Sequence, residues 1–276
     1  MVVRTSGATY TGTCGSEAIL VVVTIMRTIV LAAAIATSAA APALIAQRQN
    51  APQPRSSSVG GPQGPAPKLA DGRPDFSGVW LGVYGHFDLA QRMSKGGEVP
   101  LNAAGKVLMA SRQSKDDPEA NCLPTGVPRT APYPWRMLQT PTHVFILFEG
   151  NIHSYRQIFV DGRKHPDDPD PTWYGHSIGH YEGMTLVVDT IGFNDKFWFD
   201  STGRPHSEKL HTVERFTRTD LATLTVETMI DDPTYYTKPF TISYSARLRP
   251  GEELMEYICQ ENEQDTKHLK GPAGAP

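Results

Sequence analysis

The chain has 276 residues, of which 39% are hydrophobic, and its formal net charge is −3. This hydrophobic content is ordinary for a globular protein and too high for a disordered one. Because positive charge is not in excess, the composition argues against nucleic acid as a partner. The length suits one large domain or two small ones.

Residues 26–46 have the layout of a secretory signal peptide. A positive start at Met26-Arg27 is followed by an apolar, alanine-rich run, and cleavage is expected after Ala43 or Ala46. Residues 1–25 then form an upstream extension. The alternative is a membrane anchor, but Arg27 interrupts the apolar stretch and the part after it is short for a bilayer span. We therefore expect a periplasmic or secreted protein with no stable membrane span after cleavage.

The mature chain divides by composition into three parts. Residues 47–70 are rich in Pro, Gly, Ser and Gln and predict a flexible linker. Residues 71–265 carry the apolar patterns of a single β domain, and residues 266–276 form a tail.

Cys122 and Cys259 are the two cysteines that remain after cleavage. An even number of cysteines in an oxidising compartment favours a disulfide between them. Two buried free thiols are the alternative.

Short apolar runs separated by turn residues predict a mostly β fold of successive hairpins. The expected hairpins pair residues 144–148 with 153–160, 177–181 with 185–190, 210–218 with 223–230, and 240–248 with 254–259. One short helix is expected at residues 102–113, capped by Asn102. An antiparallel meander of this kind is expected to close into a lipocalin-like barrel, because closure leaves no bare edge; a two-layer β-sandwich is the alternative.

Seven short motifs are distinctive as a set and lie at residues 74–80 (PDFSGVW), 121–129 (NCLPTGVPR), 161–163 (DGR), 181–190 (YEGMTLVVDT), 214–216 (ERF), 232–233 (DP) and 257–262 (YICQEN). Together they resemble those of an uncharacterised family of exported bacterial proteins that has no established activity. Met184 departs from the Asp or Asn that the family tends to have in this turn. The resemblance implies that about residues 70–265 form one domain and implies little about chemistry.

Residues 175–179 match G-x-S-x-G, the nucleophile elbow of α/β hydrolases, and Asp189 and His211 follow Ser177 in the order of a triad. That motif requires a strand before the serine and a helix after it. Here a loop precedes Ser177 and a strand follows. Glycines that ease a strand into a tight corner are the alternative interpretation.

His176, His180 and Glu182 are spaced to share one face of a strand, which makes them weak candidates for metal ligands. His153 or His211 would complete such a set. The spacing is not diagnostic of a metal site, so no metal and no other cofactor is predicted.

Charged residues within the predicted strands are the main candidates for a functional site. Glu214 and Arg215 are adjacent, so one of them must face the interior of a closed barrel. We expect Arg156, His180, Asp189 and either Glu214 or Arg215 to converge inside the barrel or at one mouth. In this hypothesis His180, Asp189 and Glu214 are catalytic candidates, whereas Arg156 and Arg215 bind ligand. The alternative is an internal salt bridge, for example between Arg156 and Glu214.

Trp198 and Phe199 lie in a long loop between two predicted strands. They are candidates for binding an apolar or aromatic ligand at a barrel mouth, and a minor core beneath the loop is the alternative.

The expected function is therefore the binding of a small, apolar or aromatic molecule. A hydrolase or lyase that uses histidine and carboxylates, and a structural domain of the cell envelope, are the alternatives. No glycine-rich nucleotide motif is present.

Overall fold

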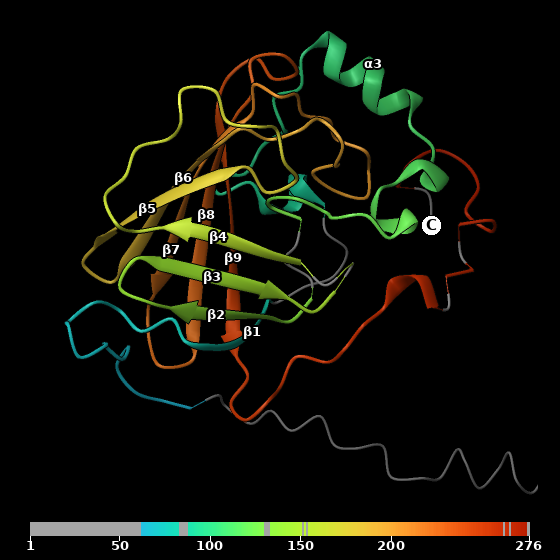
Figure 1. The fold of residues 1–276 in the computed structure, drawn as a ribbon. Coiled ribbons are helices and arrows are strands. Elements are labelled where there is room, and N and C mark those ends of the chain that lie inside the picture. Colours follow the sequence, from blue (N-terminus) through green and yellow to red (C-terminus); the bar gives the residue numbers. More distant parts are fainter. Residues whose placement is uncertain are drawn as a thin grey trace, which may run out of the picture. The chain divides into compact units, whose positions relative to one another are not determined.

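The computed structural model describes residues 62–82, 88–129, 133–150, 152, 154–261, 263, 264 and 266–274. Within these residues, nine strands close into one barrel in chain order (Figure 1). The strands are β1 (Gly78–Gly82), β2 (Trp135–Gln139), β3 (His143–Phe148), β4 (Ser154–Phe159), β5 (His176–Glu182), β6 (Thr185–Ile191), β7 (His211–Arg218), β8 (Thr223–Asp231) and β9 (Phe240–Leu248). The prediction of a mostly β, closed barrel is confirmed, and pairing of β1 with β9 excludes the open sheets of a sandwich.

Eight of the nine junctions between these strands are antiparallel. The exception is β4 with β5, which are parallel and pair only at Ile158–Ser177 and Phe159–Ile178. Parallel pairing requires a long connection that brings the chain back to the end where β4 began, and residues 160–175 supply it. The sheet is therefore not the simple meander that the sequence predicts, and β4–β5 is its weakest junction.

The hairpins β3–β4, β5–β6 and β7–β8 form as predicted. The predicted strand at residues 254–259 is wrong, because β1 already occupies the free edge of β9 and residues 252–258 have no strand structure. β2 was not predicted. Its pattern is weak, since it follows a proline-rich loop and exposes Leu138.

The barrel interior is filled by side chains that alternate along each strand. Large apolar residues from around the barrel form one buried cluster, which includes Trp80, Met137, Ile158, Val188, Phe216 and Val226. Residues with the opposite parity face outward. This alternation decides which polar side chains meet inside the barrel and which meet on its surface.

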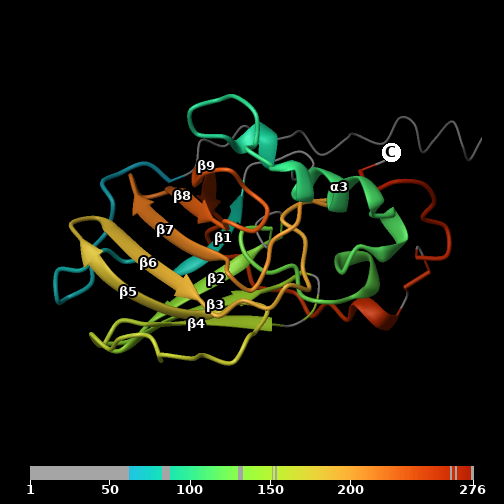
Figure 2. The same ribbon diagram turned by 90° about the horizontal axis from the view of Figure 1, so that it is seen from above.

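A second core lies under the loops and the barrel end where β8 finishes and β9 begins. It contains Leu89, Phe193, Phe197, Phe199, Leu210, Ile230, Tyr236 and Phe240. Helix α3 (Ala103–Ser111) lies to one side of the barrel strands, as does the C-terminal segment (Figure 2). Asn102 caps α3 as predicted, because its side chain accepts a hydrogen bond from Gly105 N at 2.9 Å.

Four short 3₁₀ helices complete the described secondary structure: η1 (Leu89–Arg92), η2 (Ser114–Asp116), η3 (Glu119–Asn121) and η4 (Cys259–Glu261). The predicted Cys122–Cys259 disulfide is present, with a Cα–Cα distance of 5.6 Å, and joins the end of η3 to η4.

No helix in the described ranges is long and apolar enough to cross a membrane. The predicted signal peptide and residues 1–25 lie outside the described residues.

Candidate functional site

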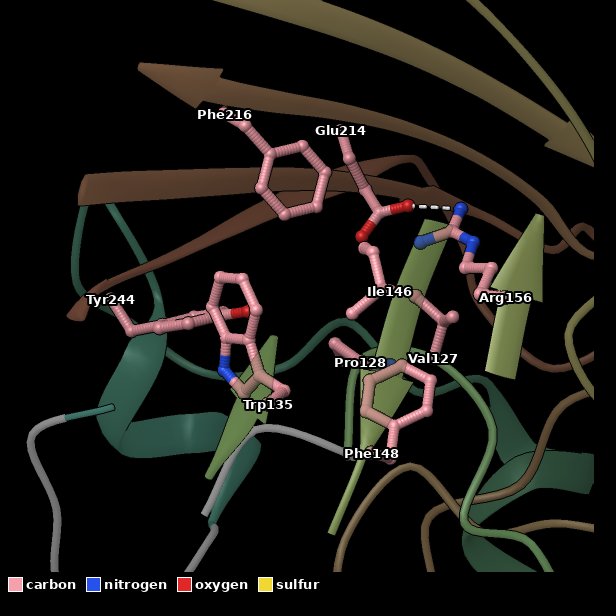
Figure 3. A pocket seen from close by; sticks show the side chains of 9 residues that line it. All are labelled: Val127, Pro128, Trp135, Ile146, Phe148, Arg156, Glu214, Phe216 and Tyr244. Carbon is pink, nitrogen blue, oxygen red and sulfur yellow. Dashed lines mark ion pairs between the residues drawn. The ribbon is translucent and has the colours of Figure 1, made fainter. Parts of the chain in front are cut away.

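Arg156 on β4 and Glu214 on β7 form an ion pair inside the barrel (Figure 3). Arg156 Nη2 lies 2.5 Å from Glu214 Oε2, and each residue is only 3% exposed. Arg156 also donates from Nε to Ser177 Oγ at 3.1 Å and from Nη2 to Thr190 Oγ1 at 2.8 Å. The internal salt bridge that the sequence offered as an alternative is therefore confirmed, and the guanidinium ties four strands together.

A small cavity lies beside this ion pair. Its volume is about 20 Å³, which leaves room for about one water molecule. The side chains that surround it are Val127, Pro128, Trp135, Ile146, Phe148, Arg156, Glu214, Phe216 and Tyr244 (Figure 3). This part of the barrel interior is too small for an organic ligand.

A much larger groove of about 630 Å³ opens on the side of the barrel, between β4 and β5. It exists because these strands pair at only two positions and separate on the side where each strand begins. Aromatic side chains form much of its wall, and Arg156 and Ser177 also line it. The aromatic residues are Tyr155, Phe159, Trp173 and Tyr174.

Two of these aromatic residues have contrasting surroundings. Tyr155 is 62% exposed and projects from the outer face of β4. Tyr174 stacks on Phe148, with ring centroids 5.4 Å apart, and its hydroxyl lies 2.7 Å from Ser154 Oγ. Burial raises the pKa of Tyr174 to about 12, so its hydroxyl is protonated at neutral pH.

A chain of hydrogen bonds links three histidines and one aspartate on the outer face of β5, β6 and β7. His165 Nδ1 lies 2.8 Å from His176 Nδ1, and His165 Nε2 lies 2.9 Å from Asp189 Oδ1. The other carboxylate oxygen, Asp189 Oδ2, lies 2.9 Å from His211 Nε2. The strand register explains the grouping, because Asp189 sits opposite Ile178 and Val213, two residues from His176 and His211.

His176 is the member of this chain that lines the β4–β5 groove. Its ring stacks on Phe159, with centroids 5.2 Å apart and planes inclined by 21°. Burial lowers the pKa of His176, and the nearby Arg163 and any positive charge on His165 lower it further. The lowered pKa favours the neutral imidazole, and the stacking on Phe159 and the hydrogen bond to His165 fix the orientation of the ring.

The four residues predicted to converge do not all meet. Arg156 and Glu214 meet inside the barrel, but Asp189 faces outward with His165 and His211. His180 is exposed and lies 3.0 Å from Glu182, which also pairs with Arg215 at 2.7 Å. The physical reason is the pleat of β5–β7, which points His180, Asp189 and Arg215 away from the interior.

The serine triad is ruled out by the same alternation. Asp189 and His211 are hydrogen-bonded, as a triad requires, but on the outer face. Ser177 is buried on the inner face and hydrogen-bonds to Arg156 and Thr190. The serine and the histidine therefore lie on opposite sides of the sheet.

The weak metal candidates share the outer face of β5 but have separate partners. His176 bonds to His165, whereas His180 bonds to Glu182. In the described part of the chain, the one group of three metal-ligating side chains with converging donor atoms is Cys122, Cys259 and Glu263, and its two sulfurs form the disulfide. His153 lies outside the described residues.

Trp198 and Phe199 do not line the groove. Phe199 is fully buried in the second core, and Trp198 is buried beneath Arg112, whose guanidinium lies 4.8 Å from the ring centroid. The minor core that the sequence offered as an alternative is what this loop covers.

His165, Tyr155 and Tyr174 were missed as site residues. His165 lies in a loop with no strand pattern, so its neighbours depend on how the loop folds back over the sheet. Tyr155 lies on a predicted strand, but only the separation of β4 from β5 makes it a groove residue.

No protein-family model, curated protein sequence or solved structure matches this chain. The fold and the site together define a closed nine-stranded barrel, within the described residues, with a packed interior and a lateral groove.

Proposed function

We propose that this protein binds a small organic molecule with an aromatic ring in the β4–β5 groove. The observation that carries the proposal is the groove itself. Its volume of about 630 Å³ falls within the range of about 300–1,000 Å³ that is typical of small-molecule sites. The ligand site is thus on the side of the barrel and not at its centre.

The lining of the groove supports an aromatic ligand. Tyr155, Phe159 and Trp173 offer ring faces and edges, against which aromatic molecules pack well. Arg156, Ser177 and His176 add a few polar groups that would orient the ligand. A mostly apolar wall with few polar groups is typical of ligand sites.

The test uses 1-anilinonaphthalene-8-sulfonate as an aromatic probe, with binding followed by its fluorescence. We expect saturable binding to the folded protein and about tenfold weaker binding to Tyr155→Ala, the loss of about 1.4 kcal/mol typical of an aromatic contact. Tyr155 is largely exposed, so this variant should stay folded.

Leu138→Ala is the matched control. Leu138 is 43% exposed on β2 and does not line the groove. The control should bind the probe like the wild type. Equal affinity of both variants, or no saturable binding at all, would contradict the proposal and favour a structural domain without a ligand.

We also propose that the chain is exported, on the basis of the signal-peptide layout of residues 26–46. A disulfide is consistent with an oxidising compartment.

A further inference from the structure

The outer-face chain of His176, His165, Asp189 and His211 runs from one groove to another. His176 lines the β4–β5 groove, and His211 lines a second groove of about 360 Å³, which lies beside Pro169 and Gly192. Three hydrogen bonds of 2.8–2.9 Å hold the outer-face chain together.

The hydrogen bonds determine which nitrogen of each neutral ring carries the proton. An ionised carboxylate only accepts hydrogen bonds, so His165 Nε2 and His211 Nε2 must both donate to Asp189. When His165 is neutral and carries its proton on Nε2, its Nδ1 is unprotonated and can only accept a hydrogen bond. His176 Nδ1 must then be the donor in the bond between the two rings.

This hydrogen bond also determines whether the other nitrogen of His176, Nε2, carries a proton. With its proton on Nδ1, a neutral His176 has an unprotonated Nε2. The hydrogen bonds of this ring to described residues involve Nδ1 and leave Nε2 for a ligand. The negative charge of Asp189 thus sets the tautomer of a ring two hydrogen bonds away.

We infer that His176 is a general base for a ligand or water molecule in the β4–β5 groove, with His165 and Asp189 as positioning residues. The inference rests on the proposed function, because it needs a molecule in that groove. In the proton-transfer step, an O–H bond of the bound molecule breaks and its electron pair stays on oxygen. The proton forms an N–H bond at His176 Nε2.

The positive charge that forms on His176 can move toward Asp189 through the hydrogen bonds of His165. As His176 Nε2 gains a proton, its Nδ1 proton can shift to His165 Nδ1, which leaves the charge on the ring that donates to Asp189. Other charged groups near His176 are Arg163, stacked on Phe159 at 3.8 Å, and Asp170 and Arg156 on the groove wall. Arg163 favours the neutral ring before transfer, and Asp189 stabilises the charge after it.

The first test reads the tautomer directly, by long-range ¹⁵N–¹H NMR of the labelled, folded protein at pH 7.5. We expect His176 to be neutral with its proton on Nδ1. In Asp189→Asn, the side-chain amide can donate a hydrogen bond to His165 Nε2. The tautomers of His165 and His176 then both reverse, and the His176 proton lies on Nε2. A wild-type His176 with its proton on Nε2 would overturn the inference. A purely structural network would show the same switch of tautomer, so turnover, measured in the second test, is the readout that a structural role would not move.

The second test uses p-nitrophenyl acetate as a neutral ester. A water molecule loses its proton to His176, its oxygen bonds to the carbonyl carbon, and p-nitrophenolate leaves. General-base catalysis contributes about 100-fold or more, so we expect a loss of that size in both His176→Gln and Asp189→Asn. The control is Glu182→Gln on the same face of β5, which bonds to His180 and Arg215 and should keep wild-type turnover.

Equal turnover by wild type and His176→Gln would overturn the inference. Binding of the aromatic probe distinguishes failure of the general-base inference from failure of the proposed ligand binding. If 1-anilinonaphthalene-8-sulfonate binds in a Tyr155-dependent way while turnover does not depend on His176, the groove binds ligand without general-base chemistry. If the probe does not bind, the proposed function itself fails.

Discussion

His206 is the residue whose chemistry most strongly links this fold to pH. Its ring is 2% exposed and packs against Phe197 and Phe199, with centroids 3.7 Å and 5.0 Å away. Its Nε2 is buried without a hydrogen-bond partner. Burial lowers the pKa of His206 to about 4, because the apolar surroundings disfavour the charged ring.

This lowered pKa predicts a loss of stability in mild acid. Between pH 6.5 and 4 the unfolded chain binds a proton at His206 that the folded chain does not, so the free energy of unfolding falls as pH falls. From pH 7.5 to 5 the loss from this residue is about 2 kcal/mol. Urea unfolding of wild type and His206→Phe at both pH values measures it.

The variant should lose about 2 kcal/mol less than the wild type over this pH range. Comparing the two proteins cancels the contributions of the other histidines. An equal loss in both proteins would show that His206 is not buried as a neutral ring.

At the scale of elements, the segment from η3 to the start of β2 holds one wall of the site in place. Arg129 is buried and donates to Asp117 through two hydrogen bonds of 2.7 Å, and Tyr133 donates to Glu119 at 2.7 Å. The same segment supplies Pro124 to the groove and Val127 to the small cavity. The Cys122–Cys259 disulfide anchors it to η4.

Removal of this disulfide should therefore affect both stability and the groove. The bond closes a loop with a sequence separation of 137 residues, and the chain-entropy model assigns about 4 to 5 kcal/mol to such a loop. We expect the double variant Cys122→Ser with Cys259→Ser to unfold at lower urea concentration by up to this amount. Its affinity for the aromatic probe should also fall, because Pro124 is less firmly held.

Two observations would contradict this prediction. One is an unchanged urea midpoint in the double variant. The other is a mature wild-type protein whose Cys122 and Cys259 both react with iodoacetamide under denaturing, non-reducing conditions.

At the scale of the whole molecule, the barrel has a packed interior and a groove on its side, where we propose that ligand binds. Apolar side chains and the Arg156–Glu214 pair fill the centre. The parallel β4–β5 junction opens the sheet over part of its length, and the groove occupies that opening. The buried side chains of Arg156 and Ser177 line this groove, so a ligand there would contact them without entering the interior.

Export is a prediction about the whole chain. Expressed in a bacterial host with its N-terminus intact, the protein should be recovered from the periplasm or medium, with a first residue between Leu44 and Gln47. N-terminal sequencing provides the measurement. A membrane-bound product that retains Met26 would instead favour the anchor interpretation.

The sequence by itself determined the elements that local patterns control. Alternation and turn residues predicted three of the hairpins, Asn102 predicted the start of α3, and the even cysteine count favoured the disulfide that is present. The adjacency of Glu214 and Arg215 required that one of them face inward. All of these follow from neighbours along the chain or from simple counting.

Only the tertiary structure decided which strands meet at long range and which face of each strand turns inward. Closure of β1 on β9 removed the predicted strand at residues 254–259, and the parallel β4–β5 junction created the groove. The inward direction of Ser177 separated it from Asp189 and His211, while the loop fold brought in His165. Alternation in a sequence defines two faces but does not say which is buried, because that depends on packing against strands distant in the chain.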